Sequence, residues 1–182
     1  YFLNMFFTKR KAIILIIICS IFFILTYNDV RSKEFQIISG TALVTDGDTI
    51  KINKNKIRLF GIDAPELNQY CYNNLQKYPC GKESKEWLKM ITNNSEISCL
   101  YSEKDRYKRI LGICYLSDAD SLSDLKKIKL FEINSLIVRS GNAVAYRKYS
   151  KKYIDDEDYA RINKKGIWIG KFDMPWDFRR KK

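Results

Sequence analysis

The sequence contains no histidine among its 182 residues. Imidazole is the side chain whose ordinary pKa lies closest to neutral pH, and it is the commonest metal ligand in proteins. Its absence excludes a histidine general base, a histidine general acid and any zinc site that contains histidine. Acid–base and metal chemistry must therefore use carboxylates, arginine, tyrosine and oxygen ligands, and oxygen ligands are those that Ca²⁺ and Mg²⁺ prefer.

Proline and glycine are also scarce, with 3 and 8 residues, and the sequence shows no internal repeat. Hydrophobic residues make up 46% of the chain, which is typical of a globular protein, and the length suits one domain with a substantial core. The 21 acidic residues are outnumbered by 33 Lys and Arg, so the formal net charge is +12. This excess favours polyanionic partners such as nucleic acid or anionic lipid heads; a lysine-rich bias with a solvated surface is the alternative interpretation.

A long apolar run occupies residues 12–25, directly after the basic stretch Thr8-Lys9-Arg10-Lys11. This order is typical of a secretory signal or of a short uncleaved anchor. Residues 26–31 offer a poor cleavage site, which favours the anchor, although crossing a bilayer takes about 17–25 residues. The basic stretch predicts that the remainder is exported across the cytoplasmic membrane, as an anchored, periplasmic or secreted protein.

Four cysteines follow this run, Cys71, Cys80, Cys99 and Cys114, and four cysteines allow three pairings. Residues 97–101 and 110–115 have the pattern of two strands joined by a charged turn, and symmetry about Arg106 and Tyr107 places Cys99 opposite Cys114. Directly opposed residues of an antiparallel pair have Cα atoms about 4.5–5.5 Å apart, within disulfide range. We therefore expect disulfides Cys99–Cys114 and Cys71–Cys80; four reduced thiols in a cytosolic protein are the alternative.

Apolar–polar alternation begins at residues 35–38, and five short strands are predicted at residues 41–44, 49–52, 56–59, 97–101 and 110–115. Helical spacing predicts helices over residues 82–93, over residues 133–140 up to Gly141, and over residues 153–165 up to Gly166. Residues 67–81 are expected to be a loop and residues 117–130 a polar connection. Strands followed by helices predict an α+β domain, a small β-barrel with about three packed helices. This divides the chain into a signal or anchor segment (1–30), the barrel domain (35–170) and a basic C-terminal tail (171–182).

Carboxylates and arginines gather at the ends of these predicted strands. Asp46-Gly47-Asp48-Thr49 and the stretch from Arg58 to Glu66, which contains Ile62-Asp63-Ala64-Pro65, lie within about twenty positions of each other, and Asp105-Arg106-Tyr107-Lys108-Arg109 adds a second hairpin. Two carboxylates can bind one hard cation such as Ca²⁺ or Mg²⁺, and guanidinium groups form bidentate contacts with anionic oxygens. The combination suits cleavage of a phosphodiester.

Together with Arg139-Ser140-Gly141-Asn142-Ala143-Val144-Ala145-Tyr146 and Gly166-Ile167-Trp168, these motifs appear in an order that resembles the staphylococcal-nuclease-like (thermonuclease) family over residues 35–170. The resemblance implies a five-stranded OB-type barrel with three helices. It also implies a calcium-dependent endonuclease that hydrolyses DNA and RNA with low sequence specificity, as a monomer without a protein partner.

The resemblance also implies roles for individual residues. Asp48 and Asp63 match metal carboxylates, and Ala64 matches a position that ligates through its backbone carbonyl. Arg58 and Arg109 match the two guanidiniums that clamp the phosphate. Glu66 matches the carboxylate that orients or deprotonates the attacking water. Tyr107 and Tyr146 match aromatic residues that line the nucleotide site.

The sequence departs from the family pattern at Lys108, where the family often has glycine, and in the longer segments 67–81 and 117–130. Singly, each site residue has an ordinary explanation: Arg58 as an exposed strand residue, Arg109 as part of a charged hairpin tip. Residues 179–182 are expected to be solvated. The rival functions are a non-catalytic nucleic-acid-binding OB-type module tethered to a membrane, and a membrane-associated protein that binds lipid heads.

Overall fold

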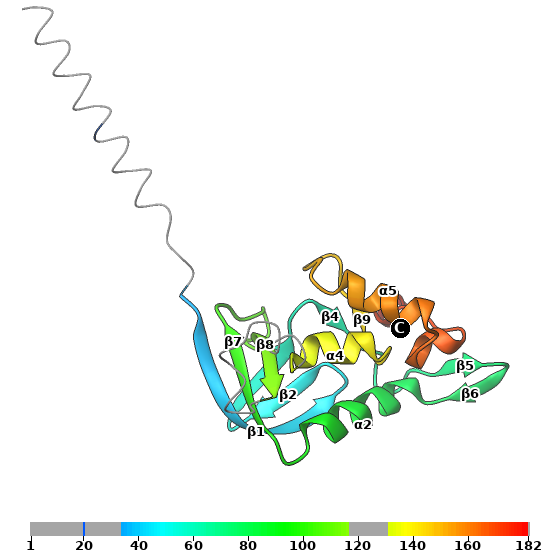
Figure 1. Cartoon of the computed structure of the whole chain (residues 1–182), viewed down its shortest axis with the longest axis horizontal. Coiled ribbons are helices and arrows are strands. Elements are labelled where there is room, and N and C mark those ends of the chain that lie inside the picture. Colours follow the sequence, from blue (N-terminus) through cyan, green and yellow to red (C-terminus); the bar gives the residue numbers. More distant parts are fainter. Residues whose placement is uncertain (1–19, 21–33, 117–130, 182) are drawn as a thin grey trace, which may run out of the picture. The chain divides into compact units, whose positions relative to one another are not determined.

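The computed structural model of the chain describes residue 20, residues 34–116 and residues 131–181. The chain divides into Tyr1–Glu34 and a compact unit, Phe35–Lys182, which Figure 1 shows as a barrel with attached helices. The apolar run 12–25 and the connection 117–130, both discussed above, lie outside the described residues. Within the described residues, no helix is long and apolar enough to cross a membrane.

Strands predominate in the first part of the compact unit and helices in the last part. In order, its elements are β1 (Gln36–Asp46), β2 (Thr49–Ile52), β3 (Asn55–Leu59), β4 (Ile62–Asp63), β5 (Cys71–Asn73), β6 (Gln76–Tyr78), α2 (Cys80–Thr92), β7 (Glu96–Tyr101), β8 (Ile110–Leu116), α4 (Ile133–Arg139), β9 (Val144–Ala145), α5 (Ile154–Ile162), a 3-10 helix (Gly166–Ile169) and α6 (Pro175–Arg180).

Five strands close into a barrel in the order β1-β2-β3-β8-β7. All neighbours are antiparallel except β3 and β8, which run parallel. Long β1 serves two partners, since Gln36–Thr41 pairs with β7 and Ala42–Asp46 pairs with β2. The predicted α+β class and five-stranded barrel are confirmed.

Alternation in β2 and β3 builds the barrel interior. Ile50 and Ile52 on β2 and Ile57 and Leu59 on β3 are fully buried, while Lys51 between the first pair is exposed. Successive residues of a strand point to opposite faces of the sheet. A pattern with a period of two therefore supplies both the buried core and the solvated surface. Asn53 closes the hairpin with φ of 53°, a left-handed conformation that asparagine tolerates better than most residues.

The β7–β8 hairpin has the register that its sequence symmetry predicts. Cys99 pairs directly with Cys114, and the two are joined by a disulfide with Cα atoms 4.0 Å apart. A second disulfide joins Cys71 to Cys80. Both predicted pairings are confirmed.

The predicted helices pack against the barrel (Figure 1): α2 contacts β1, and α4 contacts β8 and α5. Asn134 on α4 is fully buried and joins this helix to the barrel. Its Nδ2 donates to the carbonyls of Phe60 (3.0 Å) and Gly112 (3.1 Å), and its Oδ1 accepts from the amide of Cys114 (3.1 Å). One side chain thus hydrogen-bonds to three backbone groups at the end of the parallel pairing between β3 and β8.

Two segments differ from the sequence-based expectation. Residues 67–81 contain a short hairpin, β5–β6, in addition to loop, because the Cys71–Cys80 disulfide staples its base and Asn74 takes a left-handed turn conformation. Residues Pro175–Arg180 form an α-helix, α6, that the sequence pattern did not predict, while Arg179, Arg180 and Lys181 at its end are exposed, as expected. Proline at its first position favours the helix start, and Trp176, which stacks on Tyr146, holds the helix against the domain.

Candidate active site

The turn between β1 and β2 places Asp48 at one end of the barrel. The amide of Asp48 donates to Oδ1 of Asp46 (3.1 Å), and its carbonyl accepts from the amide of Leu59 (2.8 Å). Gly47 allows α2 to approach, because a Cβ there would lie 2.1 Å from Oγ of Ser84 and 2.7 Å from Cβ of Ala64. The Asp-Gly-Asp turn is therefore fixed by both the sheet and a helix.

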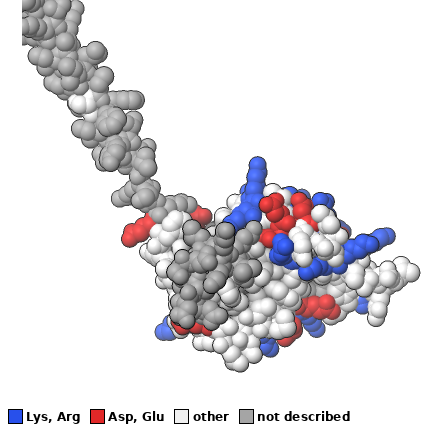
Figure 2. All heavy atoms as spheres, viewed as in Figure 1, with Lys and Arg blue, Asp and Glu red and all other residues white. Residues whose placement is uncertain are grey.

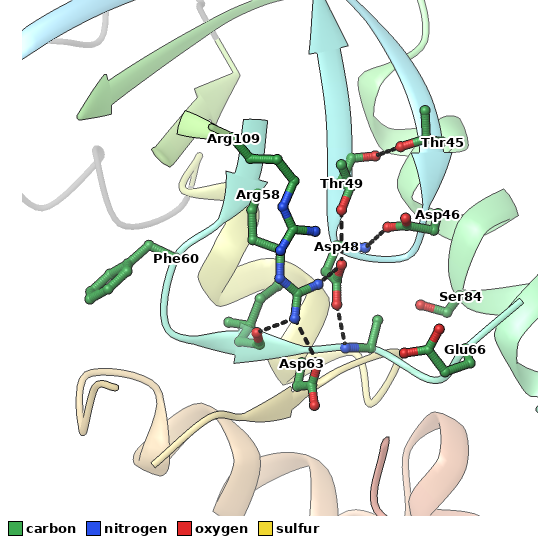
Figure 3. Close-up of polar contacts among 12 residues, drawn as sticks. Thr45, Asp46, Asp48, Thr49, Arg58, Phe60, Asp63, Glu66, Ser84 and Arg109 are labelled. Carbon is green, nitrogen blue, oxygen red and sulfur yellow. Dashed lines mark hydrogen bonds and ion pairs between the residues drawn. The ribbon is translucent and has the colours of Figure 1, made fainter. Parts of the chain in front are cut away.

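Arg58 on β3 lies between the two carboxylates predicted to bind metal (Figure 3). Its Nη1 forms an ion pair with Oδ1 of Asp48, and its Nη2 lies 2.6 Å from Oδ1 of Asp63. Burial lowers the pKa of Arg58, and Asp63 opposes that shift. Arg58 is thus no ordinary exposed strand residue: it is a largely buried cation held by two carboxylates.

Further hydrogen bonds hold the Asp48 carboxylate in place. Oδ2 accepts from the amide of Ala64 (2.8 Å), and Oδ1 accepts from Oγ1 of Thr49 (3.1 Å). Asp48 and Ala64, separated by sixteen positions in the chain, are therefore direct neighbours. The structure joins the two motifs that the sequence separates.

Gly61 positions the strand that carries Asp63. Its φ is 76°, and a Cβ there would lie 2.9 Å from both Cβ of Ser150 and Cε2 of Tyr153. The Gly61 carbonyl accepts from the amide of Tyr146 (2.8 Å), next to the β4–β9 pairing of Ile62 with Ala145. This turn thereby brings Tyr146, predicted to line the nucleotide site, beside the carboxylates.

The tip of the β7–β8 hairpin carries Arg109 and Tyr107. Oδ1 of Asp105 accepts from the amides of both residues, each at 2.9 Å. Burial alone would raise the pKa of Asp105, but these hydrogen bonds and those from the Arg109 side chain lower it below its ordinary value. Lys108, where the family often has glycine, has φ of 63°, so this position requires the left-handed conformation that glycine adopts freely.

These elements surround a cavity of ≈ 850 Å³. Seven of the predicted site residues line it: Asp48, Arg58, Ala64, Glu66, Tyr107, Arg109 and Tyr146. Asp63 is 0% exposed and lies behind the lining. The structure thus brings all eight residues to one end of the barrel, and in Figure 3 the side chains of Arg58 and Arg109 lie next to each other.

Arg179 on α6 also lines this cavity, and the sequence analysis missed it. Its Nη2 lies 2.7 Å from Oδ2 of Asp63, and its Nη1 lies 2.7 Å from Oε1 of Glu66. The available signal was the pattern of Pro175 followed by an aromatic residue, which is typical of a helix start and not of a solvated tail.

Three tyrosines, Tyr107, Tyr146 and Tyr149, are among the residues that line the cavity. Tyr146 stacks on Trp176 with ring centroids 5.4 Å apart and meets Tyr149 edge to face at 4.7 Å. Tyr107, on the hairpin tip, is 65% exposed and lies against the guanidinium of Arg106. Exposed rings of this kind offer stacking surfaces to nucleic-acid bases.

The donor chemistry of the site fits an oxygen-ligated cation. Asp48 and Asp63 approach one positive charge, the Arg58 guanidinium, from two sides, so they are close enough to share a cation. Within the described residues, no three Asp, Glu, His or Cys side chains are arranged to bind one metal ion. Ca²⁺ usually binds about six to eight oxygen ligands. Two carboxylates suit it when backbone carbonyl, water and substrate oxygens supply the remaining ligands.

The net charge of the chain does not create a uniformly basic surface. On the face shown in Figure 2, Lys and Arg side chains lie beside Asp and Glu side chains. At the cavity the same mixture is concentrated, with carboxylates paired to guanidiniums. A closed five-stranded barrel with such a cavity at one end defines a class of protein suited to phosphodiester chemistry.

Comparisons with known proteins identify the family. A model of staphylococcal nuclease homologues matches residues 56–170. The succinoglycan biosynthesis protein ExoI of Rhizobium meliloti (strain 1021) is 34% identical over 134 residues, which cover 72% of this chain and 64% of that protein. A micrococcal nuclease of Shigella flexneri is 32% identical (75% of this chain, 77% of that protein). An uncharacterized endonuclease of Escherichia coli is 30% identical (76% and 82%). The chain therefore belongs to the staphylococcal nuclease homologue family, and its barrel domain is a nuclease domain.

Proposed function

We propose that the protein is a calcium-dependent phosphodiesterase that hydrolyses DNA and RNA with low sequence specificity. The observation that carries the proposal is the cavity in which Asp48, Arg58, Glu66 and Arg109 meet, with Asp63 directly behind them. A phosphodiester resists attack because its anionic oxygens repel the nucleophile, so fixed cations beside those oxygens lower the barrier.

Each residue has a defined task in this proposal. Arg58 and Arg109 bind the phosphate oxygens as charge builds on them, and their planar guanidiniums allow two-pronged contacts that lysine cannot make. Glu66 orients the attacking water or accepts its proton. Asp48, Asp63 and the carbonyl of Ala64 would hold Ca²⁺, which polarises the phosphate when bound.

Substrate recognition is proposed to be independent of base sequence. Tyr107, which is 65% exposed, and Tyr146 both line the cavity, and every base can stack on a ring. The described residues offer guanidiniums for the backbone phosphates, which all nucleic acids share. Both features favour activity on DNA and RNA alike.

Degradation of supercoiled plasmid and of single-stranded RNA tests the proposal. The full chain, purified in mild detergent, should degrade both with Ca²⁺ and neither in EDTA, with Glu66→Gln as the inactive control. Full activity in EDTA would contradict the metal assignment. Binding of either nucleic acid without degradation would instead favour the non-catalytic, membrane-tethered binding module, and binding of anionic vesicles alone would favour the lipid-head alternative.

We also propose that the domain is exported across the cytoplasmic membrane, anchored through its N-terminal segment, and monomeric. The apolar run at 12–25 behind Lys9-Arg10-Lys11 supports this, and so do two disulfides, which form and persist in oxidising compartments. Cell fractionation with sequencing of the mature N-terminus tests it. A soluble product that starts near residues 28–33 would contradict the anchor, and a full-length soluble cytoplasmic protein would contradict export.

A further inference from the structure

The C-terminal segment Lys171–Lys181 lies beyond the residues 56–170 that match the family model, yet it is built into the site. The backbone of Lys171 exchanges two hydrogen bonds with Tyr72 on β5, both at 2.8 Å. Farther along, Trp176 stacks on Tyr146 in the cavity wall. These contacts hold the C-terminal segment on β5 at Lys171 and on the cavity lining at Trp176.

A buried glutamine connects the same segment to Glu66. Gln69 is 0% exposed, its Nε2 donates to the carbonyl of Asp173 (2.7 Å), and its Oε1 accepts from the amide of Glu66 (3.2 Å). One side chain therefore fixes both the backbone of Glu66 and the chain that leads into α6. The separation between Glu66 and Arg179 is set by this shared anchor.

Arg179 in turn joins two carboxylates. It contacts both oxygens of Asp63, Oδ2 at 2.7 Å and Oδ1 at 3.1 Å, and Oε1 of Glu66 at 2.7 Å. Burial lowers the pKa of Arg179, but the hydrogen bonds to Asp63 and Glu66 outweigh burial and raise it, so the guanidinium stays charged. Arg58 covers only Oδ1 of Asp63, which leaves Oδ2 of this fully buried carboxylate to Arg179.

We propose that Arg179 is a positioning residue of the active site, which holds Asp63 and Glu66 in one fixed relationship through a single guanidinium. This inference rests on the proposed hydrolytic function. Hydrogen-bond donors that hold a metal-binding carboxylate fix its orientation, and loss of such a donor costs about 10–100-fold in metal affinity or activity. Glu66, whose side chain is 35% exposed, would otherwise be free to turn into solvent.

Two glutamine variants on the same helix turn test the proposal. Arg179→Gln removes the contacts to both carboxylates, while Arg180→Gln removes the same charge from a neighbour that pairs with Asp177. For each we would measure kcat and KM on plasmid DNA with Ca²⁺, Ca²⁺ binding without substrate by calorimetry, and thermal unfolding by circular dichroism. An Arg179→Lys variant, which keeps the charge but reaches fewer oxygens, completes the set.

For Arg179→Gln, kcat should fall about 10–100-fold while KM changes little, and Ca²⁺ affinity should weaken about 10-fold. Arg179→Lys should give intermediate values, and Arg180→Gln should match the wild type. If Arg179→Gln is unfolded, the lysine variant decides at a temperature where it is folded. Unchanged kcat in Arg179→Gln, or a change in KM alone, would overturn the positioning role; an inactive wild type would instead overturn the proposed function.

Discussion

Arg109 contacts one oxygen of Asp105, Oδ2, through both Nε and Nη2, and both distances are 2.7 Å. The other oxygen, Oδ1, accepts the two backbone amides that close the hairpin tip. A single carboxylate therefore folds the tip and orients the guanidinium that points to the cavity. Because four positions separate the two residues, the fold of the tip and the direction of Arg109 cannot be changed independently.

We predict that Asp105→Asn lowers kcat up to about 100-fold, because a small displacement of a phosphate-binding group costs that much. In the same variant, the free energy of unfolding should fall less than in the wild type as the pH is lowered. Since the pKa of Asp105 is lowered in the folded state, its stabilisation is present above the ordinary pKa of about 3.9 and is lost as the pH falls through the lower, folded value. Denaturant titrations between pH 2 and about pH 6 measure this.

The matched control is Asp158→Asn, which removes a carboxylate that pairs with Arg161 on the surface of α5. It should keep both the activity and the acid dependence of the wild type. Wild-type kcat in Asp105→Asn would show that Arg109 is oriented by other contacts.

The two phosphate-binding arginines lead to a prediction about kinetics. Arg58→Lys and Arg109→Lys should each lose about 10²–10³-fold in kcat with a much smaller change in KM, because the guanidinium contacts strengthen as charge builds in the transition state. Steady-state kinetics on plasmid DNA measure both values, with the exposed Arg161→Lys as control. A variant that loses only KM would mark that arginine as a binding residue with no part in the rate.

Gly47 gives a prediction about how closely α2 approaches the site. A Cβ at this position would lie 2.1 Å from Oγ of Ser84, which donates to the carbonyl of Asn142. Gly47→Ala should therefore reduce the free energy of unfolding by about 1–3 kcal/mol, the usual cost of overpacking, and reduce activity by displacing Asp48. Urea unfolding and plasmid degradation measure the two effects. Wild-type values in both would mean that α2 shifts without affecting the turn.

Most of the fold could be predicted because it depends on local patterns. The β7–β8 register follows from symmetry about Arg106 and Tyr107, since residues equally far from the tip of a hairpin oppose each other. The Asp-Gly-Asp turn and Arg58 lie at the ends of neighbouring strands, so their meeting at one end of the barrel follows from strand order. Helices α2 and α4 carry the apolar spacing that packs them on the barrel, whereas α5 contacts α4 and buries Asp156, Glu157 and Ala160.

Contacts between distant segments could not be predicted in this way. Arg179 is 116 positions from Asp63, and nothing in the local pattern of a short, arginine-rich helix specifies which carboxylate it meets. Strands β5 and β6 have three residues each, too few for a period to be visible. The ion pairs of Arg58 were hidden for another reason, because the alternation of Ile57 and Leu59 around it is the pattern of an exposed position.

Two tyrosines beside Glu132, Tyr115 and Tyr153, predict a loss of stability in alkali. Burial and nearby Glu132 raise the pKa of Tyr115 to about 12, and the same causes raise the pKa of Tyr153, whose hydroxyl donates to Glu132 (2.7 Å). The stabilisation is complete below the ordinary tyrosine pKa of about 10 and is lost as the pH rises toward the folded values. Unfolding followed by tyrosine absorbance between about pH 9 and pH 12 should show this decline, and Tyr153→Phe should reduce it. A stability that stays constant over this range would contradict the raised pKa values.

The two disulfides should contribute unequally to stability. Cys99 and Cys114 are fully buried in the main core, whereas Cys71 and Cys80 belong to the smaller cluster beside the β5–β6 hairpin. Closing loops with sequence separations of 15 and 9 stabilises by about 2–3 kcal/mol each in the chain-entropy model. Replacing Cys99 and Cys114 by alanine also leaves space in the core, so that double variant should lose more free energy of unfolding than the Cys71/Cys80 variant. Urea unfolding of both variants measures the two losses, and peptide mapping of the wild type checks the pairings. An equal or larger loss in the Cys71/Cys80 variant would show that this disulfide stabilises more of the domain than its position indicates.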